Sequence, residues 1–571
     1  MLLLLPPEIA VRVLCFLELP DLMRMQQVHS RLREYIQSFH KLQYRIATLS
    51  AYVEDNPKSA LPMSERLKLL KEREQGWARC NIDFRCVISV EHKPSGIYDL
   101  TGGIYLSGDR DGHTLHYVQL PSKVDDSIEW KSIDVEKPVI DIGLSVLEHD
   151  LLAAITSSAH PTEAHKYVHE VQLLQLSTGK AHPRAQIPAL FLANSREKRP
   201  TVVAIEIVGV HLVLIAKHNT GTPFSLKRDH IYMFDWTSGE IKLKFGARRD
   251  TYAGIVFLTP ELVLLSKMRV FVFEIWAIPS ESSSASALSL PAAESERENL
   301  PTPLVSLGLP ELSISYYNSE FSCRAEPNPT ASTPAYARNL NPFYAAPQEA
   351  LIICNISLSP FHGDITETSQ WIMFVRRADM LAAVTHWAGA MEMEMGTSRR
   401  WTPDGSLQDD KVAYERWGPD ITRWLLTRRR PGSWITTSAG TRCVHALPIP
   451  HGPARIRVLD FNPFTVRRSC DVQDKRAVAG LPFLQPLSGR LGHTHVPFVL
   501  EREWKEDRTA WDFDALLMDE ERLVGLKLSM AIRATGAVAS STGAAAVEEN
   551  EWDEGKLCQV SEEDVPERVF T

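Results

Sequence analysis

The chain has 571 residues, 44% of them hydrophobic and 23% charged, which is the composition of an ordinary globular protein. Most of its formal net charge of −9 lies between Glu548 and the C-terminus, so the remainder is close to neutral and lacks the basic balance of a general nucleic-acid-binding protein. No stretch reaches the roughly 18 uncharged apolar residues of a membrane span. The eight cysteines show no C-x-x-C spacing, which argues against zinc ribbons and fits the reduced thiols of an intracellular protein. We therefore expect a cytoplasmic or nuclear protein.

Residues 2–40 carry more apolar surface than so short a unit can bury by itself. Pro6 and Pro7 favour a helix start, and a helix from there to Leu17 would be apolar on nearly every side. Pro20 ends this helix, and Asp21 and Ser30 can cap a second and a third one. The pattern predicts three short helices with a surface that another protein covers.

These residues resemble the F-box family, whose pattern reads Leu-Pro-x-Glu-Ile, Ile/Val-Leu-x-x-Leu, Asp-Leu and Val-Cys-x-x-Trp. The chain departs from it at His29, where Cys is usual, and at Leu32, where Trp is usual. The resemblance implies docking on the Skp-type adaptor of a cullin-based ubiquitin ligase. The expected adaptor contacts are Leu5, Pro6, Ile9, Val13, Leu14, Leu17, Leu22 and Val28. The residues alone also allow a three-helix cap packed on the chain's own larger domain.

An amphipathic helix is predicted next, in the segment SERLKLLKEREQGWARC that begins at Ser64. Leu67, Leu70 and Trp77 mark one side of it, and we expect them to pack on a neighbouring part of this chain. Such a helix is a plausible rigid spacer between two parts of the protein.

From about residue 82 the apolar period changes to two, and strand-like runs separated by turn residues replace any long helical pattern. Short strands of this kind indicate an all-β sandwich, barrel or propeller. A weak repeat favours the propeller: VQLLQLSTGKAH (171–182) and IYMFDWTSGEIK (231–242) each place a strand before a glycine turn, at Gly179 and Gly239, and another strand after it. The length of this β region, divided by the roughly 40–60 residues of a blade, suggests six to eight blades.

The predicted fold class is therefore α+β, with a predominantly β, degenerate WD-like propeller as the main part. The segments 455–468 and 516–527 and the helix after Ser64 also resemble large fungal F-box proteins with a propeller-like C-terminal region. The hairpin of Ala515–Met518 and Leu523–Leu528 is expected to close the ring. The predicted parts are an F-box at 1–47, a helical linker at 48–80, the β domain at 81–535 with disordered loops at 279–302 and 388–412, and an acidic disordered tail at 536–571.

No catalytic or cofactor-binding motif occurs: the chain lacks a G-x-S-x-G elbow, an H-E-x-x-H helix and a P-loop. His493 and His495 can face one side of a strand, but no nearby ligand completes a metal set, and Asp109 and Asp111 fit a polar hairpin tip. A propeller hydrolase would need clustered acids or histidines at its central channel, and the sequence gives no sign of them. We expect no enzyme, cofactor or metal.

A cluster of tryptophans and arginines offers candidates for binding a target protein. Trp417, Trp424, Arg428 and Arg430 lie close in sequence, and Trp and Arg dominate binding hot spots. For the tryptophans, packing between blades is the expected role, and an aromatic rim for gripping a target is the alternative. The predicted function is a substrate receptor of a Skp–cullin–F-box ubiquitin ligase, and the rival is a propeller scaffold not linked to ubiquitination.

Overall fold

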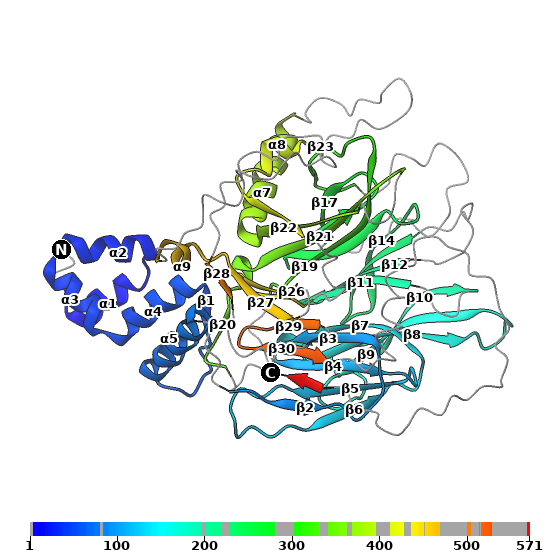
Figure 1. Ribbon diagram of the computed structural model, residues 1–571, viewed down its shortest axis with the longest axis horizontal. Coiled ribbons are helices and arrows are strands. Elements are labelled where there is room, and N and C mark those ends of the chain that lie inside the picture. The colour runs from blue at the N-terminus through cyan, green and yellow to red at the C-terminus, as the bar shows by residue number, and fades with distance from the viewer. Residues whose placement is uncertain are drawn as a thin grey trace.

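The protein divides into a helical N-terminal unit and a larger β domain (Figure 1). The computed structural model describes residues 4–79, 84–196, 201–217, 229–279, 302–331, 341–362, 368–394, 411–427, 436–449, 452–468, 500–503, 513, 515–527 and 568–570.

Four helices make up the N-terminal unit within these residues: α1 (Pro7–Leu14), α2 (Leu19–Val28), α3 (Ser30–Ser38) and α4 (His40–Ala51). Pro7 is the first residue of α1, where its missing N–H removes no intrahelical bond. The N-cap of α3 is His29, whose Nδ1 accepts a hydrogen bond from the Arg31 amide (3.1 Å), so the cap predicted at Ser30 is wrong by one residue. Asp21 lies in the first turn of α2 and does not cap it.

The fourth helix corrects the expectation of three. Leu42 of α4 packs with Leu14, Leu22 and Ile36 in the core of the first three helices. Tyr44 of the same helix packs instead against the segment that follows. Because α4 contributes to both clusters, the boundary expected near residue 47 falls inside a helix.

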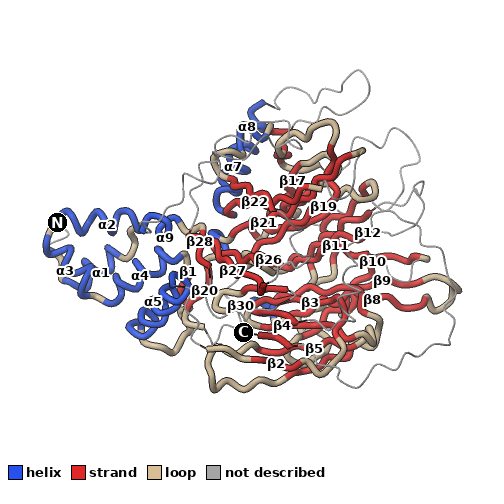
Figure 2. Tube along the Cα trace, viewed as in Figure 1, coloured by secondary structure: helices blue, strands red, loops and turns tan. Residues whose placement is uncertain are grey.

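Strands of the β domain form seven sheets in the described part of the chain, here called blades 1 to 7 (Figure 2). Blade 1 contains β3 (Pro94–Thr101), β4 (Ile104–Asp109), β5 (Thr114–Gln119) and β6 (Trp130–Asp134). Blade 2 contains β7 (Val139–Ser145), β8 (Leu151–Ala159), β9 (Tyr167–Gln175) and β10 (Ala189–Ser195), with the short α6 (Val146–His149) between its first two strands. Blade 3 contains β11 (Thr201–Val208), β12 (His211–Lys217), β13 (Asp229–Asp235) and β14 (Glu240–Ala247).

Blades 4 to 7 have the same core of four antiparallel strands, with additions between them. Blade 4 contains β15 (Tyr252–Thr259), β16 (Leu262–Lys267), β17 (Val272–Ala277), β18 (Val305–Gly308) and the parallel edge strand β23 (Lys411–Val412). Blade 5 contains β19 (Tyr316–Ala325), β21 (Leu351–Pro360), β22 (Ser369–Arg376) and β24 (Thr422–Thr427). Blade 6 contains β25 (Ser438–Ala439), β26 (Arg442–Ile449), β27 (Gly452–Asp460) and β28 (Leu500–Glu503), and blade 7 contains β29 (Ala515–Met518), β30 (Leu523–Lys527), β31 (Arg568–Phe570) and β2 (Val87–Ser89). The connections carry the 3₁₀ helix η3 (Pro347–Glu349) and the helices α7 (Arg377–Glu394), α8 (Tyr414–Trp417) and α9 (Pro463–Arg468).

Neighbouring blades pack side by side into a ring. The first strands β3, β7, β11, β15 and β19 contact one another in that order, and β25 links blade 5 to β29 of blade 7. Leu517 and Val524 of blade 7 share a buried cluster with Leu100 and Val118 of blade 1, which closes the ring. The fold is a β-propeller, as the sequence predicted, and the described residues form seven blades.

The glycine turn of the predicted repeat occurs as expected in blade 3. Gly239 has a φ of +79°, and it joins β13 to β14 through a turn in which the Asp235 carboxylate accepts hydrogen bonds from the amides of Thr237 and Ser238. In blade 2 Gly179 also turns the chain with positive φ, but the fourth strand resumes only at Ala189. The repeat therefore predicts the turns better than the strand lengths.

Two expectations for the later part of the chain need correction. An 18-residue helix, α7, interrupts a domain for which no long helical pattern was expected, and it covers residues 388–394 of the predicted loop 388–412. The tail predicted as disordered from 536 ends in β31, which lies between β2 and β30. The hairpin of β29 and β30 closes the ring as expected, and within its blade β2 pairs with β31. Residues 280–301 of the first predicted loop lie outside the described residues.

The N-terminal unit is joined to the propeller by a two-stranded sheet. Its strand β1 (Val53–Asp55) runs antiparallel to β20 (Phe343–Ala345), which lies between the first two strands of blade 5. The Asn56 amide extends this pairing with a hydrogen bond to the Pro342 carbonyl (3.0 Å). Because β20 is an insertion of blade 5, this contact fixes the N-terminal unit on the turns of that blade.

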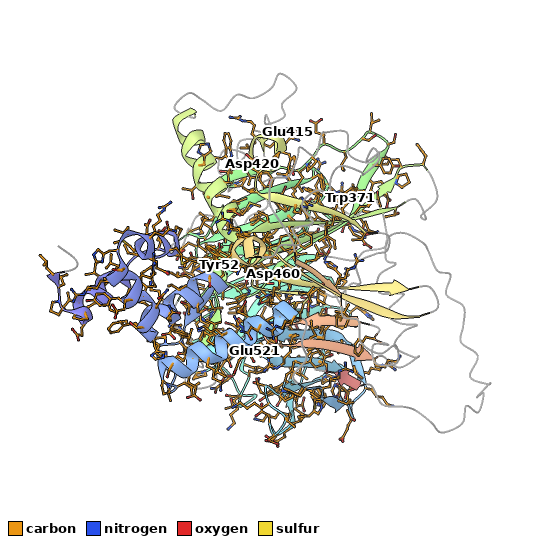
Figure 3. The ribbon with its side chains drawn as sticks, turned by 60° about the vertical axis from the view of Figure 1, so that its left-hand side comes forward. Tyr52, Trp371, Glu415, Asp420, Asp460 and Glu521 are labelled. Carbon is orange, nitrogen blue, oxygen red and sulfur yellow. The ribbon has the colours of Figure 1, made fainter. Side chains whose placement is uncertain are left out.

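Blade 6 makes a second contact with the same unit. Asn462, just before α9, donates a hydrogen bond from Nδ2 to the carbonyl of Ser50 in α4 (2.8 Å). The rings of Tyr52 and Phe464 lie 5.7 Å apart, and Figure 3 labels Tyr52 and Asp460 at this junction.

The helix α5 (Met63–Arg79) lies against the propeller. Leu67 and Leu70 are buried with Tyr44, Val53 and Phe343, which confirms that they pack within this chain. Trp77 packs at the junction of blades 6 and 7 and donates its indole N–H to the Glu520 carbonyl (3.2 Å).

An ion-pair cluster reinforces α5 at the same place. Arg442 of blade 6 contacts Glu74 of α5 (2.5 Å) and Asp460 (3.0 Å). The predicted spacer is thus a helix fixed along its length to the propeller.

Candidate functional site: an apolar face on the N-terminal helices

Large apolar side chains remain exposed on the outer part of the N-terminal unit. On α1 and just after it, Ile9 is 45% exposed, Val13 42% and Phe16 79%. Their spacing of four and three residues places them on one side of the helix. Leu4, Leu5, Met23 and Val28 add exposed apolar surface before α1 and along α2.

The opposite side of α1 forms the core of the unit. Ala10, Val11 and Leu14 are buried there, together with Leu22 of α2 and Ile36 of α3. A helix that is apolar on nearly every side therefore serves two purposes: one side stabilises the unit, and the other is left for a partner.

The structure separates the predicted adaptor contacts into two groups. Leu5, Pro6, Ile9, Val13 and Val28 are exposed. Leu14 and Leu22 are fully buried and Leu17 is half-buried against the same core, so Leu14 and Leu22 have no surface for a partner while the unit is folded.

Three exposed residues were missing from the prediction. Leu4, Phe16 and Met23 lie outside the family pattern, and Leu4 and Phe16 are the most exposed of the apolar residues in this unit. The helical spacing of Phe16 from Ile9 and Val13 was the signal that could have identified it.

Of the four candidates for target binding, the two tryptophans are buried. Trp417 and Trp424 are 4% and 5% exposed, and their indole N–H groups donate hydrogen bonds to the Gly308 carbonyl (2.7 Å) and the Tyr414 hydroxyl (3.0 Å). Both pack in the core shared by blades 4 and 5, which confirms the packing expected for them, and the alternative of an aromatic rim is wrong for these two. Arg428 and Arg430 lie outside the described residues.

The next residues to place are Asp111, predicted at a hairpin tip, and the histidine pair considered as metal ligands. The Asp111 carboxylate accepts hydrogen bonds from the amides of His113 (2.7 Å) and Thr114 (2.9 Å), so it shapes a hairpin tip as predicted. His493 and His495 lie outside the described residues. Within the described ranges, no group of three or more His, Cys, Asp or Glu side chains is arranged to hold a metal ion.

Buried charges meet at the centre of the ring, which the sequence did not reveal. Asp99 of β3, Asp141 of β7 and Glu206 of β11 come from the first strands of three blades. Arg324 of β19 contacts Asp99 (2.7 Å) and Glu326 (3.0 Å). Glu206 accepts a hydrogen bond from Asn328 Nδ2 (2.6 Å). Acids do cluster at the channel, as a hydrolase would require, but Arg324 and Asn328 engage three of them in structural contacts.

Asp141 makes stability depend on pH, because burial raises the pKa of its carboxyl to about 7. The folded protein therefore binds more protons than the unfolded chain between about pH 4 and 7, and it loses stability as the pH rises through this window. Asp141→Asn keeps the oxygen that accepts the Ile142 amide and removes the charge. We expect its stabilising effect to grow by on the order of 2 kcal/mol from pH 5 to pH 8, measured as the melting temperature of variant and wild type.

The matched control is Asp125→Asn, which removes a carboxylate from an exposed position. Equal pH slopes for Asp141→Asn and the wild type would contradict the assignment.

Comparison with known protein families supports the assignment of the N-terminal helices. Residues 2–44 match the family model of the F-box domain, which confirms the F-box expected from the sequence. No match was found among curated proteins. No helix in the part of the chain described here is long and apolar enough to cross a membrane.

Similar solved structures are propellers, at low similarity. The WD40 domain of Toxoplasma gondii coronin is 10% identical, with a TM-score of 0.32 over 66% of this chain and 73% of that chain. The β-propeller domain of Myceliophteria thermophila Cps50 (Swd1) is 10% identical, with a TM-score of 0.25 over 51% of this chain and 86% of that chain. The β-propeller domain of the Trilobed protease from Pyrococcus furiosus is 9% identical, with a TM-score of 0.24 over 50% and 82%. The blade order, and not these scores, establishes the fold.

Proposed function

We propose that this protein is the substrate-recognition subunit of a Skp–cullin–F-box ubiquitin ligase, acting in the cytoplasm or nucleus. Its F-box domain binds a Skp-type adaptor and through it a cullin, and its propeller binds a target protein. The ubiquitin transfer chemistry belongs to the partner enzymes, and this chain contributes proximity.

The observation that carries the proposal is the exposed side of α1. Ile9, Val13 and Phe16 form an apolar stripe that no other part of the described chain covers. Apolar groups that are contiguous on a surface mark a protein interface, because burying each of them gains on the order of 1 kcal/mol or more.

The placement of the helices favours this proposal over an F-box that merely caps its own propeller. The unit contacts the propeller through the elements that follow α3: α4 touches α9, and β1 pairs with β20. The helix α1 packs on α3 and α4, and the N-terminus, near which it begins, lies at the end of the unit away from the propeller (Figure 1). An adaptor can therefore reach α1 without displacing the propeller.

The attachment of α4 and α5 to blades 5, 6 and 7 gives the receptor a defined geometry. A target on the propeller would be held at a fixed distance and orientation from the adaptor. A fixed geometry that matches the position of the conjugating enzyme raises the effective concentration of the target there, and a geometry that does not match abolishes it.

Replacing Ile9 tests the proposal directly. We expect the full-length wild type to bind a purified Skp-type adaptor and Ile9→Asp to bind at least 100-fold more weakly, because a carboxylate would be buried at the interface. Binding is measured by surface plasmon resonance, with the melting temperature as a check of folding.

Gln37→Asp is the matched control, since Gln37 is exposed on α3 outside the apolar stripe. It should bind like the wild type. Absence of binding by the folded wild type would leave the propeller scaffold as the function.

A further inference from the structure

Two cysteines lie in contact inside blade 5. Cys323 of β19 and Cys354 of β21 are direct partners in the antiparallel pairing of these strands, and their Sγ atoms are 3.0 Å apart. Both are free thiols. Directly paired residues of antiparallel strands have Cα atoms about 4.5–5.5 Å apart, which lies within the range that a disulfide spans. A bond between the two sulfurs therefore requires the side chains to move, and not the strands.

The two cysteines differ in their surroundings. Cys323 is 8% exposed, and Cys354 is fully buried. Burial raises the pKa of the Cys354 thiol well above its usual range, and the contact with Cys323 raises it further. Because the thiolate is the form that reacts with an oxidant, Cys354 resists direct oxidation. Cys323 is therefore the one to react first, with Cys354 in place to react second.

A buried hydroxyl near Cys323 has no hydrogen-bond partner in the part of the chain that the structure describes. It belongs to Ser266 of β16, which is fully buried. Gly254 of β15 separates the two: a Cβ on this glycine would lie 3.1 Å from Ser266 Oγ and 3.3 Å from Cys323 Cβ. Burying a hydroxyl without a partner is unfavourable, and an oxygen added to the Cys323 sulfur would supply an acceptor.

We propose that hydrogen peroxide oxidises Cys323 and that Cys354 then closes a disulfide, which stiffens the attachment of the N-terminal unit. In the first step the Cys323 thiolate attacks one peroxide oxygen, the O–O bond breaks, and the departing hydroxide takes up the proton that the thiol released. In the second step the Cys354 sulfur attacks Sγ of the resulting sulfenic acid, and the hydroxyl group leaves with the Cys354 proton as water. Two thiols are oxidised, and one peroxide is reduced to two waters.

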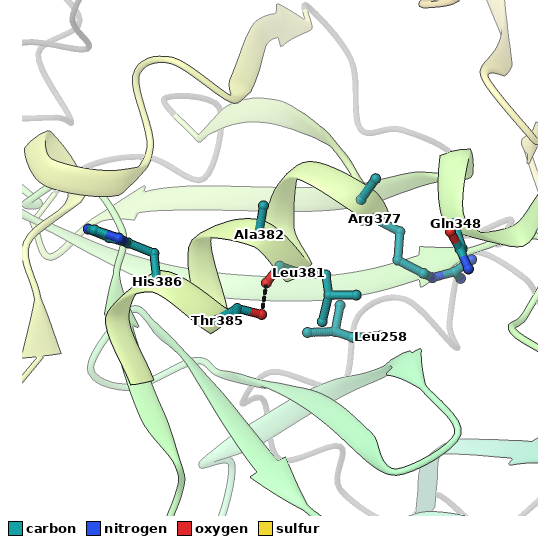
Figure 4. Close-up of a pocket in the computed structure, with 8 residues that line it drawn as sticks. Leu258, Gln348, Arg377, Leu381, Ala382, Thr385 and His386 are labelled. Carbon is teal, nitrogen blue, oxygen red and sulfur yellow. Dashed lines mark hydrogen bonds between the residues drawn. The ribbon is translucent and has the colours of Figure 1, made fainter. Parts of the chain in front are cut away.

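The disulfide would join the two ends of the segment that holds the N-terminal unit. Residues 326–350 run from β19 to β21, and they include β20, which pairs with β1. At present hydrogen bonds hold the ends together: Arg377, labelled in Figure 4, donates to the carbonyls of Pro327 (2.8 Å) and Pro347. A covalent bond closes the same loop and reduces the number of open conformations. Local opening of β20 and β1 should therefore become rarer.

The full-length protein is tested with hydrogen peroxide. Free thiols are then blocked with N-ethylmaleimide, and the digested protein is analysed by mass spectrometry. We expect the peptides that contain Cys323 and Cys354 as a linked pair that dithiothreitol separates. Cys443 is the internal control: it is fully buried in blade 6, burial raises the pKa of its thiol, and it should not be oxidised.

Variants test the order of the two steps. In Cys354→Ala the sulfenic acid of Cys323 has no thiol to react with, so dimedone should label it, whereas Cys354 in Cys323→Ala should stay unlabelled. Adding Ser266→Ala to Cys354→Ala should lower this labelling roughly tenfold, the effect of losing about one hydrogen bond. Ser132→Ala, at an exposed position of blade 1, is the matched control and should leave it unchanged.

Hydrogen exchange measures the effect on the attachment. Exchange in β1 and β20 should slow when the wild type is oxidised and should not change in Cys354→Ala. Absence of the linked pair, oxidation of Cys443 at the same rate, or unchanged exchange in the linked protein would overturn the proposal. None of these measurements involves the adaptor, so the outcome is independent of the proposed function.

Discussion

We expect Leu14→Asp to unfold the F-box domain, whereas Val13→Asp, one residue earlier on α1, leaves it folded and removes adaptor binding. Leu14 is fully buried among Leu22, Leu32 and Ile36, and an aspartate there finds no polar partner. Losing the buried leucine and burying a carboxyl should cost about 3–5 kcal/mol. Val13 is 42% exposed, so its aspartate stays in water.

The two variants are distinguished by hydrogen exchange and limited proteolysis of residues 7–51 in the full-length protein. Leu14→Asp should lose protection in α1 to α3, and Val13→Asp should keep it while losing adaptor affinity. Leu14→Met is the matched control and should cost less than about 1.5 kcal/mol. Full protection in Leu14→Asp would contradict the core position of Leu14.

This pair also shows what the sequence can and cannot specify. The apolar pattern identified α1 and its need for a partner, because the number of apolar residues exceeds what the unit can bury. It could not separate Leu14 from Val13, since both are apolar and only the packing of α3 and α4 decides which one faces inward. The family pattern has the same limit, because it mixes core and contact positions.

In the propeller, local sequence patterns predicted the strands and turns, but the sequence did not predict the pairing of strands that are far apart in the chain. Alternating apolar residues and glycine turns such as Gly239 predicted strands and hairpins. The seventh blade gains its fourth strand by the pairing of β2 with β31, across nearly the whole chain, and no local pattern encodes that pairing. The helix α7 was missed although Met380 and Val384 have helical spacing, because the run around them is rich in small residues and lies between strands.

The sites within the propeller depend on tertiary structure in the same way. Asp99, Asp141 and Glu206 each stand alone in a strand, and only closure of the ring brings them together. The alternative of an aromatic rim was wrong for Trp417 and Trp424, because proximity in sequence to arginines says nothing about burial. Their indole N–H groups find acceptors inside the core, which removes the cost of burying them.

The second large effect is expected at Arg442, which joins α5 to blade 6. Arg442 is 8% exposed and contacts both Glu74 and Asp460. Burial opposes ionisation of Glu74, but Arg442 and Arg73 hold the pKa of its carboxyl below the usual range. Arg442→Met should therefore cost about 3 kcal/mol, seen as a lower melting temperature and as faster hydrogen exchange in α5.

The control is Arg24→Met, which breaks the ion pair with Asp21 on the surface of α2, where the two side chains are 75% and 52% exposed. It should cost less than about 1 kcal/mol. The double variant Glu74→Gln, Arg442→Met should recover part of the loss, because Glu74, which would keep only Arg73 as a cationic partner, is then neutral. If Arg442→Met were as mild as Arg24→Met, the cluster would not fix α5 to the propeller, and the distance between adaptor and target would depend on the β1–β20 pairing and the contacts of α4 alone.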